Sequence, residues 1–514
     1  MGEQAALTGP DLGSDGVSVV EVADGEMILG HADDKPVVLA RIGGDVFAVS
    51  GRCTHYGGPV GRGLFDGELV SCPWHHAAFD VRTGRAARAP ALNPLPRFEV
   101  EERDGRLYVG EQIEYEWSPP AIEEPPDSVV VVGAGAAASS AVESLRDEGY
   151  LGPVTMIGVE ETVPTDRPNL SKDYLAGTAP EEWMPLRSES FYEDLGITLR
   201  LGTSVTAIDR ERRMITLDDG SDLSYGDLLL APGADPIQLP LPGADLPHVH
   251  KLRTLANSRA IISGAEIASS AVVLGASFIG LEVAASLRNR DIEVHVVAPE
   301  DVPMARVLGI DVGRFIQALH ENHGVEFHLG HVATRIEADH VLLDDSTSIA
   351  ADLVVMGVGV RPATALAEAA GLELDNGIVV DEQLRTSDPH IWAAGDAVDY
   401  PDRRLGRPIR VEHWVVAQRH GQVAAQNILG RNVPFQDAPF FWSQHYDIRI
   451  NYVGHAERWD GYEVTGSIED GDALIAYREE GEITAVATIG RDVDSLRAQA
   501  AMERGDTDAL ERML

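Results

Sequence analysis

The sequence has very few residues of two types and lacks two kinds of segment. Its 514 residues include only two cysteines, Cys53 and Cys72, and three lysines, Lys35, Lys172 and Lys251. No uninterrupted apolar run is long enough to span a bilayer, and the first residues have neither the basic nor the apolar stretch of a secretion signal. We therefore expect a cytoplasmic protein without a membrane span.

Positive charge is also scarce, because 41 basic residues are set against 83 acidic ones and the net charge is −42. Such a surface repels nucleic acid and anionic lipid, so the sequence predicts neither as a partner. The excess of acid fits a salt-rich cytoplasm and equally a high-GC genome in which arginine replaces lysine. A chain of this length is expected to form three or four domains of about 100–200 residues each.

The two cysteines each lie shortly before a histidine: Cys53 before His55, and Cys72 before His75. Two thiolates and two imidazoles on paired loops are typical of a two-iron, two-sulfur cluster whose outer iron is bound by histidine, the Rieske arrangement. Glycines and a proline at 57–59 allow the tight turn that such a loop needs. The sequence therefore predicts a cluster that carries one electron at a time.

Two other interpretations of the cysteine and histidine pattern remain open. Tetrahedral zinc also accepts two cysteines and two histidines, but zinc-finger spacing places both histidines on one helix rather than one behind each cysteine. A pair of buried free thiols would leave the two matched histidines unexplained. Residues 53–80 resemble the Rieske family closely, with one departure at His76, where that family usually has glycine.

Turn-forming residues and one proline-rich stretch divide the chain into regions. Residues 17–50 and 96–110 alternate apolar and polar residues between Gly and Asp turns, which predicts short antiparallel strands in a small β-domain that carries the cluster loops. Residues 117–127 are rich in proline and acid and are typical of a semi-rigid linker. After the linker the pattern changes to alternating strands and helices.

A first nucleotide-binding pattern begins at the buried strand 129–132. Gly133 and Gly135 would let the backbone approach a pyrophosphate, and the helix that follows would supply amide donors. Ala138 replaces the third glycine, which the pattern tolerates. Glu160 ends the next strand, at the distance expected for an acid that holds a ribose hydroxyl.

A second nucleotide-binding pattern occupies residues 271–280. Gly275 and Gly280 frame the turn, Ser277 stands where the middle glycine is usual, and the next strand ends at Glu300. Two dinucleotide folds beside an electron-transfer cluster predict FAD and a nicotinamide. Negative charge at Glu300 favours NADH over NADPH, although Ala298 fills the more usual acid position.

With these motifs in order, residues 127–514 resemble the FAD- and NAD-dependent reductases that include ferredoxin reductases and the apoptosis-inducing-factor family. The Rieske motif in front makes the Rieske-bearing, apoptosis-inducing-factor-like subgroup the best match. The resemblance implies a multidomain fold: an all-β Rieske domain, two α/β Rossmann-like domains of the glutathione-reductase type and a C-terminal α+β domain. The expected limits are 15–115 (Rieske), 116–126 (linker), 127–249 with 373–434 (FAD), 250–372 (NAD) and 435–514.

The resemblance also implies roles for individual residues. In residues 166–172, Arg167 and Lys172 would contact the flavin, and Lys172 would pair with Glu282 as catalytic residues beside the flavin ring. A plain surface ion pair is the alternative for these two, and ordinary core packing is the alternative for the tryptophans given below. The remaining residues assigned to the cofactor sites are Gly233, Arg253, Phe278, Ile279, Gly359, Gly395, Asp396, Glu412, His413, Trp414 and Trp442.

Histidines at 320, 323, 328 and 331 have spacings seen in metal sites, and a Rieske centre beside a histidine pair would suggest an oxygenase with mononuclear iron. However, residues 315–320 are typical of a helix, Gly324 of its end, and residues 325–329 of the strand that follows. A helix followed by such a strand is common inside a nucleotide-binding domain. The sequence therefore predicts no metal site there.

Together these features predict an oxidoreductase in which NADH gives a hydride to FAD and single electrons leave through the Rieske cluster to an unidentified acceptor. Reduction of a disulfide is excluded, because both cysteines belong to the cluster. Two alternatives stay open: an NADH-sensing signalling protein with a long-lived reduced flavin, and a ferredoxin-reductase component with a separate acceptor protein. A monomer and a homodimer are both compatible with the sequence.

Overall fold

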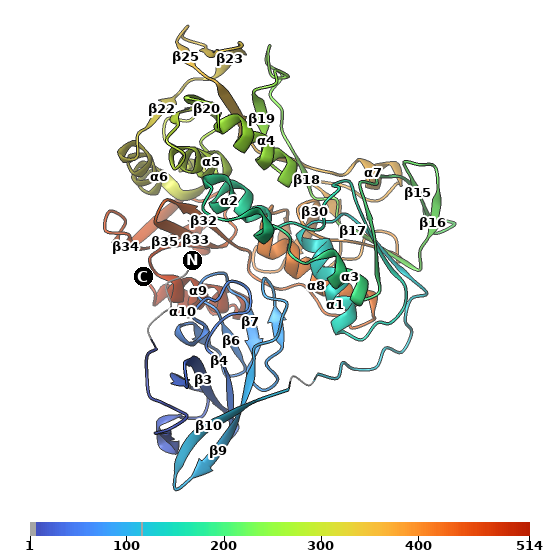
Figure 1. Cartoon of the computed structure of the whole chain (residues 1–514), viewed down its shortest axis with the longest axis vertical. Coiled ribbons are helices and arrows are strands. Elements are labelled where there is room, and N and C mark those ends of the chain that lie inside the picture. Colours follow the sequence, from blue (N-terminus) through green and yellow to red (C-terminus); the bar gives the residue numbers. More distant parts are fainter. Residues whose placement is uncertain (1–6, 115–116) are drawn as a thin grey trace.

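The computed structural model describes residues 7–114 and 117–514, and its chain starts with strands and short turns (Figure 1, blue). One antiparallel sheet has the order β1-β10-β9-β4-β3-β2, and a second, smaller one has the order β5-β6-β7-β8. The predicted all-β beginning is thus confirmed. The bounds are β1 Val17–Ser18, β2 Met27–Ala32, β3 Lys35–Ile42, β4 Asp45–Ser50, β5 Leu64–Phe65, β6 Leu69–Ser71, β7 Ala78–Asp80, β8 Ala86–Arg88, β9 Arg97–Arg103 and β10 Arg106–Ile113.

A parallel sheet follows, in the order β13-β12-β11-β17-β29, and we call it the first parallel sheet. Its central strand consists of four buried valines, as expected for a strand covered on both faces. Helices α1 (Ala136–Asp147) and α8 (Trp414–Ile428) pack against each other beside it. The strand bounds are β11 Val129–Val132, β12 Val154–Gly158, β13 Ile197–Leu201, β17 Asp227–Leu230 and β29 Ile391–Ala393.

A second parallel sheet has the order β19-β26-β20-β21-β22 and lies in the part of the chain that interrupts the first one. Its edge strand β22 follows helix α6 directly, with Gly324 in the left-handed conformation at the turn (φ 83°). The predicted helix-to-strand step is therefore confirmed. The bounds are β19 Val249–Lys251, α4 Leu255–Ala265, β20 Ser270–Leu274, α5 Phe278–Arg288, β21 Glu293–Ala298, α6 Ala305–Asn322, β22 Val325–Leu329 and β26 Leu353–Met356.

The chain ends with an antiparallel sheet, β32-β33-β36-β35-β34, covered by helices α9 (Asp492–Arg504) and α10 (Thr507–Glu511). None of the helices in the described residues has the length and apolar character needed to cross a bilayer. The strand bounds are β32 Phe440–His445, β33 Ile448–Gly454, β34 Gly461–Ser467, β35 Asp472–Glu479 and β36 Glu482–Ile489.

Smaller elements connect these four parts. They are α2 Asp173–Ala176, α3 Glu189–Asp194, β14 Val205–Asp209, β15 Met214–Leu217, β16 Asp222–Ser224, β18 Ala234–Pro236, β23 Ala333–Ile336, β24 His340–Leu343, β25 Ser348–Ala350, β27 Val360–Pro362, α7 Ala365–Ala369, β28 Ile378–Val379, β30 Val398–Asp402 and β31 Arg407–Ile409.

The N-terminal region lies against α1, α8 and α9 (Figure 1). The guanidinium of Arg85 donates to Asp147 at the end of α1 (2.8 Å), and that of Arg88 donates to Glu503 of α9 (2.6 Å). Arg85 also lies over the ring of Trp117 (4.2 Å), whose indole N–H donates to the carbonyl of Asp147. The start of the linker is therefore fixed to the same contact.

Candidate functional site

The cluster loops, residues 53–59 and 72–76, are two tight turns that bring the cysteine–histidine pairs together. The first turn closes through Cys53 N–H to Gly58 O (2.8 Å) and Gly57 N–H to Cys53 O (2.9 Å). The second closes through Cys72 N–H to the carbonyl of residue 77 (2.8 Å). The rings of His55 and His75 lie 5.1 Å apart, centroid to centroid.

The donor atoms of these four residues fit an iron–sulfur cluster better than a single ion. Both cysteines are free and buried, and the Nδ1 atom of His55 is buried with no hydrogen-bond partner among the described residues. Burial lowers the pKa of His55 to about 3, so its ring is the neutral ligand form. The four donors do not fall within the reach of one ion, which argues against compact tetrahedral zinc.

His76, the departure from the Rieske pattern, adopts the left-handed conformation (φ 59°) that glycine would adopt freely. Its buried ring stacks on Phe440 (3.7 Å between centroids, 12° between planes), and its Nδ1 lies 2.6 Å from Gln499 Oε1. Its carbonyl accepts a hydrogen bond from Arg419 of α8 (2.7 Å). The unusual histidine therefore joins the second cluster loop to the C-terminal sheet and to α8.

The flavin site predicted from the first nucleotide pattern is a turn that only glycine fits. At Gly133 (φ 123°) a Cβ atom would lie 2.0 Å from the carbonyl oxygen of Ala231. Gly135 precedes the first residue of α1, and Ala138 is fully buried in that helix, where a small side chain is needed. Residues 133–135 are half-buried, so the backbone of the turn before α1 is partly accessible, as pyrophosphate binding requires.

Two arginines converge on this turn. Arg167 Nη2 donates to Glu160 Oε1 (2.7 Å), and Arg253 Nη2 donates to Asp396 Oδ2 (2.8 Å). Burial, followed by the positive charge of Arg253, lowers the pKa of Arg167. The Nε atom of Arg253 is buried and has no partner among the described residues, which fits a site that an anionic cofactor completes.

The predicted pair of Lys172 and Glu282 is formed and is nearly buried. The Lys172 ammonium donates to Glu282 Oε2 (2.8 Å), with side-chain exposures of 15% and 4%. Ser171 donates to the same carboxylate oxygen and Ser443 to the other, each at 2.6 Å. No role was predicted for either serine: Ser171 lies beside Lys172 within residues 166–172, whereas no motif connects Ser443 to Glu282 along the chain.

The hydrogen-bond chain continues away from Lys172. Ser443 Oγ lies 3.1 Å from His445 Nε2, and His445 Nδ1 lies 3.2 Å from His320 Nε2. Burial lowers the pKa of His445 to about 3 and that of His320 to about 2, so both rings are neutral. His320 is thus joined through His445 and Ser443 to the Lys172–Glu282 pair.

The second nucleotide turn has the same design as the first. At Gly275 (φ 109°) a Cβ atom would lie 2.5 Å from Gly357 O, and at Gly280 it would lie 2.3 Å from Gly275 O. Ser277 is exposed at the start of α5, and its hydroxyl donates to Gly357 O (3.0 Å). Glu300 is exposed beyond the end of β21.

The remaining predicted residues are divided among several places. Trp442 is half-buried and lies against His75, a predicted cluster ligand (4.2 Å between centroids), while Trp414 packs with the core of the first parallel sheet. Three of the predicted glycines have positive φ: Gly233, Gly359 and Gly395. Glu412 is exposed and pairs with Arg410, and Ile279 is 42% exposed. The rings of His413 and Phe278 pack against Phe441.

The N-terminal region also contacts the segment that holds Lys172, a contact without a sequence signal. Asn169 Nδ2 donates to the hydroxyl of Tyr56 (3.0 Å), and the ring of Tyr56 lies 4.2 Å from that of His55. The guanidinium of Arg449 lies 5.7 Å from the ring of Trp74. The predicted ligand His55 is therefore connected through Tyr56 to the 166–172 segment, as the predicted ligand His75 is in contact with Trp442.

Comparison with known proteins agrees with this geometry. The family described as pyridine nucleotide-disulphide oxidoreductase matches residues 127–421, the Rieske [2Fe-2S] domain matches residues 17–99, and the family described as reductase C-terminal matches residues 440–513. Together these matches extend over most of the described chain.

Individual relatives agree with these families. The chain is 32% identical to human apoptosis-inducing factor 3, over 89% of this chain and 78% of the relative. It is 39% identical to rhodocoxin reductase of Rhodococcus erythropolis, over 72% and 88%. The crystal structure of a covalent putidaredoxin reductase–putidaredoxin complex superimposes with a TM-score of 0.71 at 35% identity, over 75% of this chain and 94% of the other.

Proposed function

Since the chain belongs to the pyridine nucleotide-disulphide oxidoreductase family and carries a Rieske domain in front, we propose that it sends electrons from NADH through FAD to its own cluster, and from there to a separate acceptor. When bound, the nicotinamide supplies a hydride, the flavin converts it to single electrons and the cluster carries them one at a time.

The contact between His75 and Trp442 is the observation that carries the proposal. It places a cluster ligand against β32, the strand whose Ser443 holds Glu282 and, through it, Lys172. The similar reductase structure is a complex with putidaredoxin as its partner. We propose that the Rieske domain of this chain receives electrons from the flavin, the role that a separate electron-transfer protein would otherwise have.

The flavin would be held by charge from two sides. Arg167 and Arg253 would neutralise the pyrophosphate above the start of α1. Their partners Glu160 and Asp396 already fix both guanidinium groups, and these carboxylates would accept hydrogen bonds from the ribose and ribityl hydroxyls. Because both arginines are preorganised, little side-chain entropy is lost when the cofactor binds.

Lys172 would stabilise negative charge that develops on the flavin, and Glu282 would position it. The carboxylate has three hydrogen-bond donors, so it keeps the ammonium in one orientation. A buried cation beside the ring is worth more than a solvated one, because the surrounding dielectric constant is low.

The nicotinamide cofactor would bind at the second turn, with Ser277 facing the pyrophosphate at the start of α5. The exposed carboxylate of Glu300 would accept a hydrogen bond from a 2′-hydroxyl and repel a 2′-phosphate, so we propose NADH rather than NADPH. We also propose the domain division 15–115, 127–249 with 373–434, 250–372 and 435–514, since each range contains a sheet of its own.

The Cys72→Ser variant tests this proposal, with Cys53→Ser as a second, independent variant. The flavin should still be reduced by NADH, while the EPR signal of the cluster and the reduction of an external one-electron acceptor should both be lost. Acceptor reduction that survives without the cluster would show that electrons leave from the flavin directly. A flavin that stays reduced beside an oxidised cluster in the unaltered protein would favour the NADH-sensing alternative.

A further inference from the structure

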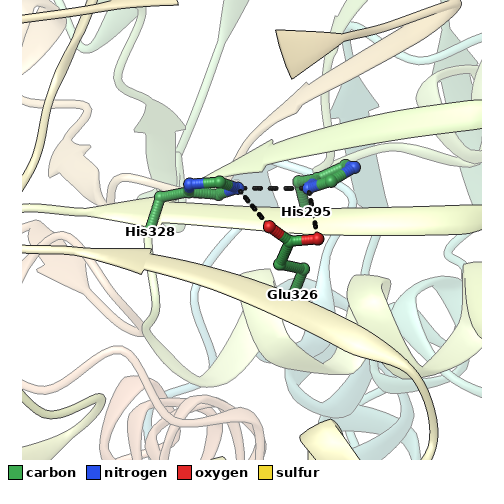
Figure 2. A group of neighbouring side chains, drawn as sticks. All are labelled: His295, Glu326 and His328. Atoms are coloured by element: carbon green, nitrogen blue, oxygen red, sulfur yellow. Dashed lines mark hydrogen bonds and ion pairs between the residues drawn. The ribbon is translucent and has the colours of Figure 1, made fainter. Parts of the chain in front are cut away.

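Two histidines and a glutamate meet on neighbouring strands of the second parallel sheet, away from the cofactor turns. His295 lies on β21, and Glu326 and His328 lie on the edge strand β22. In the parallel register His295 is opposite Glu326, and the next residue but one on each strand faces the same side. The three side chains therefore point to one side of the sheet, as Figure 2 shows.

The distances between their ligand atoms match the coordination shell of one small ion. His295 Nδ1 and His328 Nε2 are 3.1 Å apart, and the glutamate oxygens lie 3.8 Å and 3.7 Å from these two nitrogens. Ligands at about 2.0–2.1 Å from zinc in a tetrahedron are separated by about 3.3–3.4 Å. Small shifts of flexible side chains would bring all three to that separation.

A hydrogen bond between the two histidines accounts for only part of this arrangement. It would use one nitrogen of each ring and would leave the Glu326 carboxylate near both nitrogens without a hydrogen bond to either. A cation between the three groups accounts for all of the contacts. Burial, followed by the neighbouring His295, lowers the pKa of His328, which favours the neutral ring that binds metal.

The surroundings suit a divalent cation. The Glu293 carboxylate lies 3.5 Å from the other nitrogen of His295, the position of an outer carboxylate that orients a metal-binding imidazole. The side chains of His295 and His328 are only 11% and 16% exposed, whereas that of Glu326 is 65% exposed and free to adjust. The large negative charge of the whole chain raises the local concentration of cations.

We propose that His295, Glu326 and His328 bind one Zn²⁺ ion, with water as the fourth ligand. Imidazole and carboxylate suit zinc, whereas magnesium and calcium prefer oxygen ligands alone. The ion would join the edge strand β22 to β21, and the backbone of Gly330 after β22 already donates to Glu300 O (3.1 Å). The site would therefore brace the edge of the nicotinamide-binding part, independently of electron transfer.

The site joins residues that the sequence does not group. Among the histidines at 320, 323, 328 and 331, His320 contacts His445 and His323 stacks on Tyr446, so the sequence pattern is not one site. His331 lies with Asp344 and Asp345 in a second, more exposed group. The second histidine of the proposed site, His295, lies on the neighbouring strand β21.

Zinc binding to the iron-loaded holoenzyme tests the proposal. After dialysis against a chelator, one Zn²⁺ per chain should bind, and X-ray absorption fine structure at the zinc edge should show two imidazoles and oxygen at about 2.0–2.1 Å. Iron absorbs at a different edge and does not interfere. Sulfur neighbours at about 2.3 Å would place the zinc on the cluster cysteines and overturn the proposal.

Variants identify the ligands. His295→Asn and His328→Asn should each weaken zinc binding by more than about tenfold, and the zinc-induced rise in melting temperature should disappear. The control His340→Asn, at a half-buried histidine beside Asp339 in the same part of the chain, should keep both. Loss of zinc binding in His331→Asn, with retention in His295→Asn, would assign the ion to the neighbouring group and contradict the proposal. Equal melting temperatures of the metal-free variants and parent show that the fold is intact.

Discussion

One buried arginine joins the second cluster loop to α8, and its removal is the most informative single change in this protein. Arg419 is 2% exposed; its guanidinium donates to His76 O (2.7 Å) and to Ala89 O (3.1 Å), and it forms an ion pair with Asp437 (3.1 Å). Both carbonyls belong to the Rieske region, whereas the arginine belongs to α8. The change Arg419→Met keeps most of the side-chain volume and removes both hydrogen bonds.

The expected loss of docking free energy follows from these contacts. Hydrogen bonds from a charged donor contribute about 1.5–3 kcal/mol each, so the docked arrangement loses about 3–6 kcal/mol. Every 1.4 kcal/mol is tenfold in an equilibrium constant, so docking weakens by about 100-fold or more. Asp437 stays compensated, because the charges of Arg88 and Arg404 also act on it. Other contacts still hold the Rieske region against the rest of the chain. We therefore expect the rate of cluster reduction to fall by less than the docking equilibrium, by about tenfold.

The assay is anaerobic rapid mixing with NADH, in which flavin bleaching and the EPR signal of the cluster are followed separately. In the Arg419→Met variant the flavin should bleach at the parent rate, the cluster should be reduced more slowly, and proteases should cut the linker at 117–126 faster. Arg146→Met is the matched control, because Arg146 also donates to backbone carbonyls, but only within residues 127–249. Cluster reduction at the parent rate in Arg419→Met, or equal slowing in both variants, would refute the reasoning.

Three further predictions follow from the flavin site and its contact with the cluster. The change Glu282→Gln leaves the Lys172 ammonium without its counter-charge, so the flavin potential should rise by at least about 30 mV in a spectroelectrochemical titration, and an unchanged potential would contradict the role given to the pair. Trp442→Leu should slow cluster reduction and leave flavin reduction by NADH unchanged; if both rates fell together, Trp442 would belong to the nicotinamide site instead. Burial raises the pKa of Asp166 to about 6, above its unfolded value, so the folded protein loses stability as pH rises toward 6. The Asp166→Asn variant lacks this penalty, so its advantage in unfolding free energy should grow by about 2 kcal/mol between about pH 4 and pH 6 and then level off, and a constant difference would show that folding does not raise the pKa of Asp166.

The parts of the site that the sequence predicts are those built from neighbouring residues. The turn at Gly133 needs a glycine because a side chain would meet the carbonyl of Ala231, and this need is visible in the strand, turn and helix around it. The same holds for the paired turns that carry Cys53 and Cys72. Such patterns are local, so their geometry follows from a few adjacent residues.

Contacts between distant segments have no such signature. His76 meets Gln499 only because the Rieske region packs on α9, and the sequence shows it merely as a departure from a family pattern. Ser443 reaches Glu282 through the packing of β32 on α5. The pairing of His295 with His328 depends on the register of two parallel strands, which the intervening helix α6 sets.

The central claim is that electrons pass from flavin to cluster within one chain. Freeze-quench EPR after anaerobic mixing with NADH measures it directly, at protein concentrations that differ by about tenfold. We expect the cluster to be reduced within one turnover, at a rate that does not change with protein concentration. A rate proportional to protein concentration, or a reduced flavin beside a cluster that stays oxidised, would contradict it.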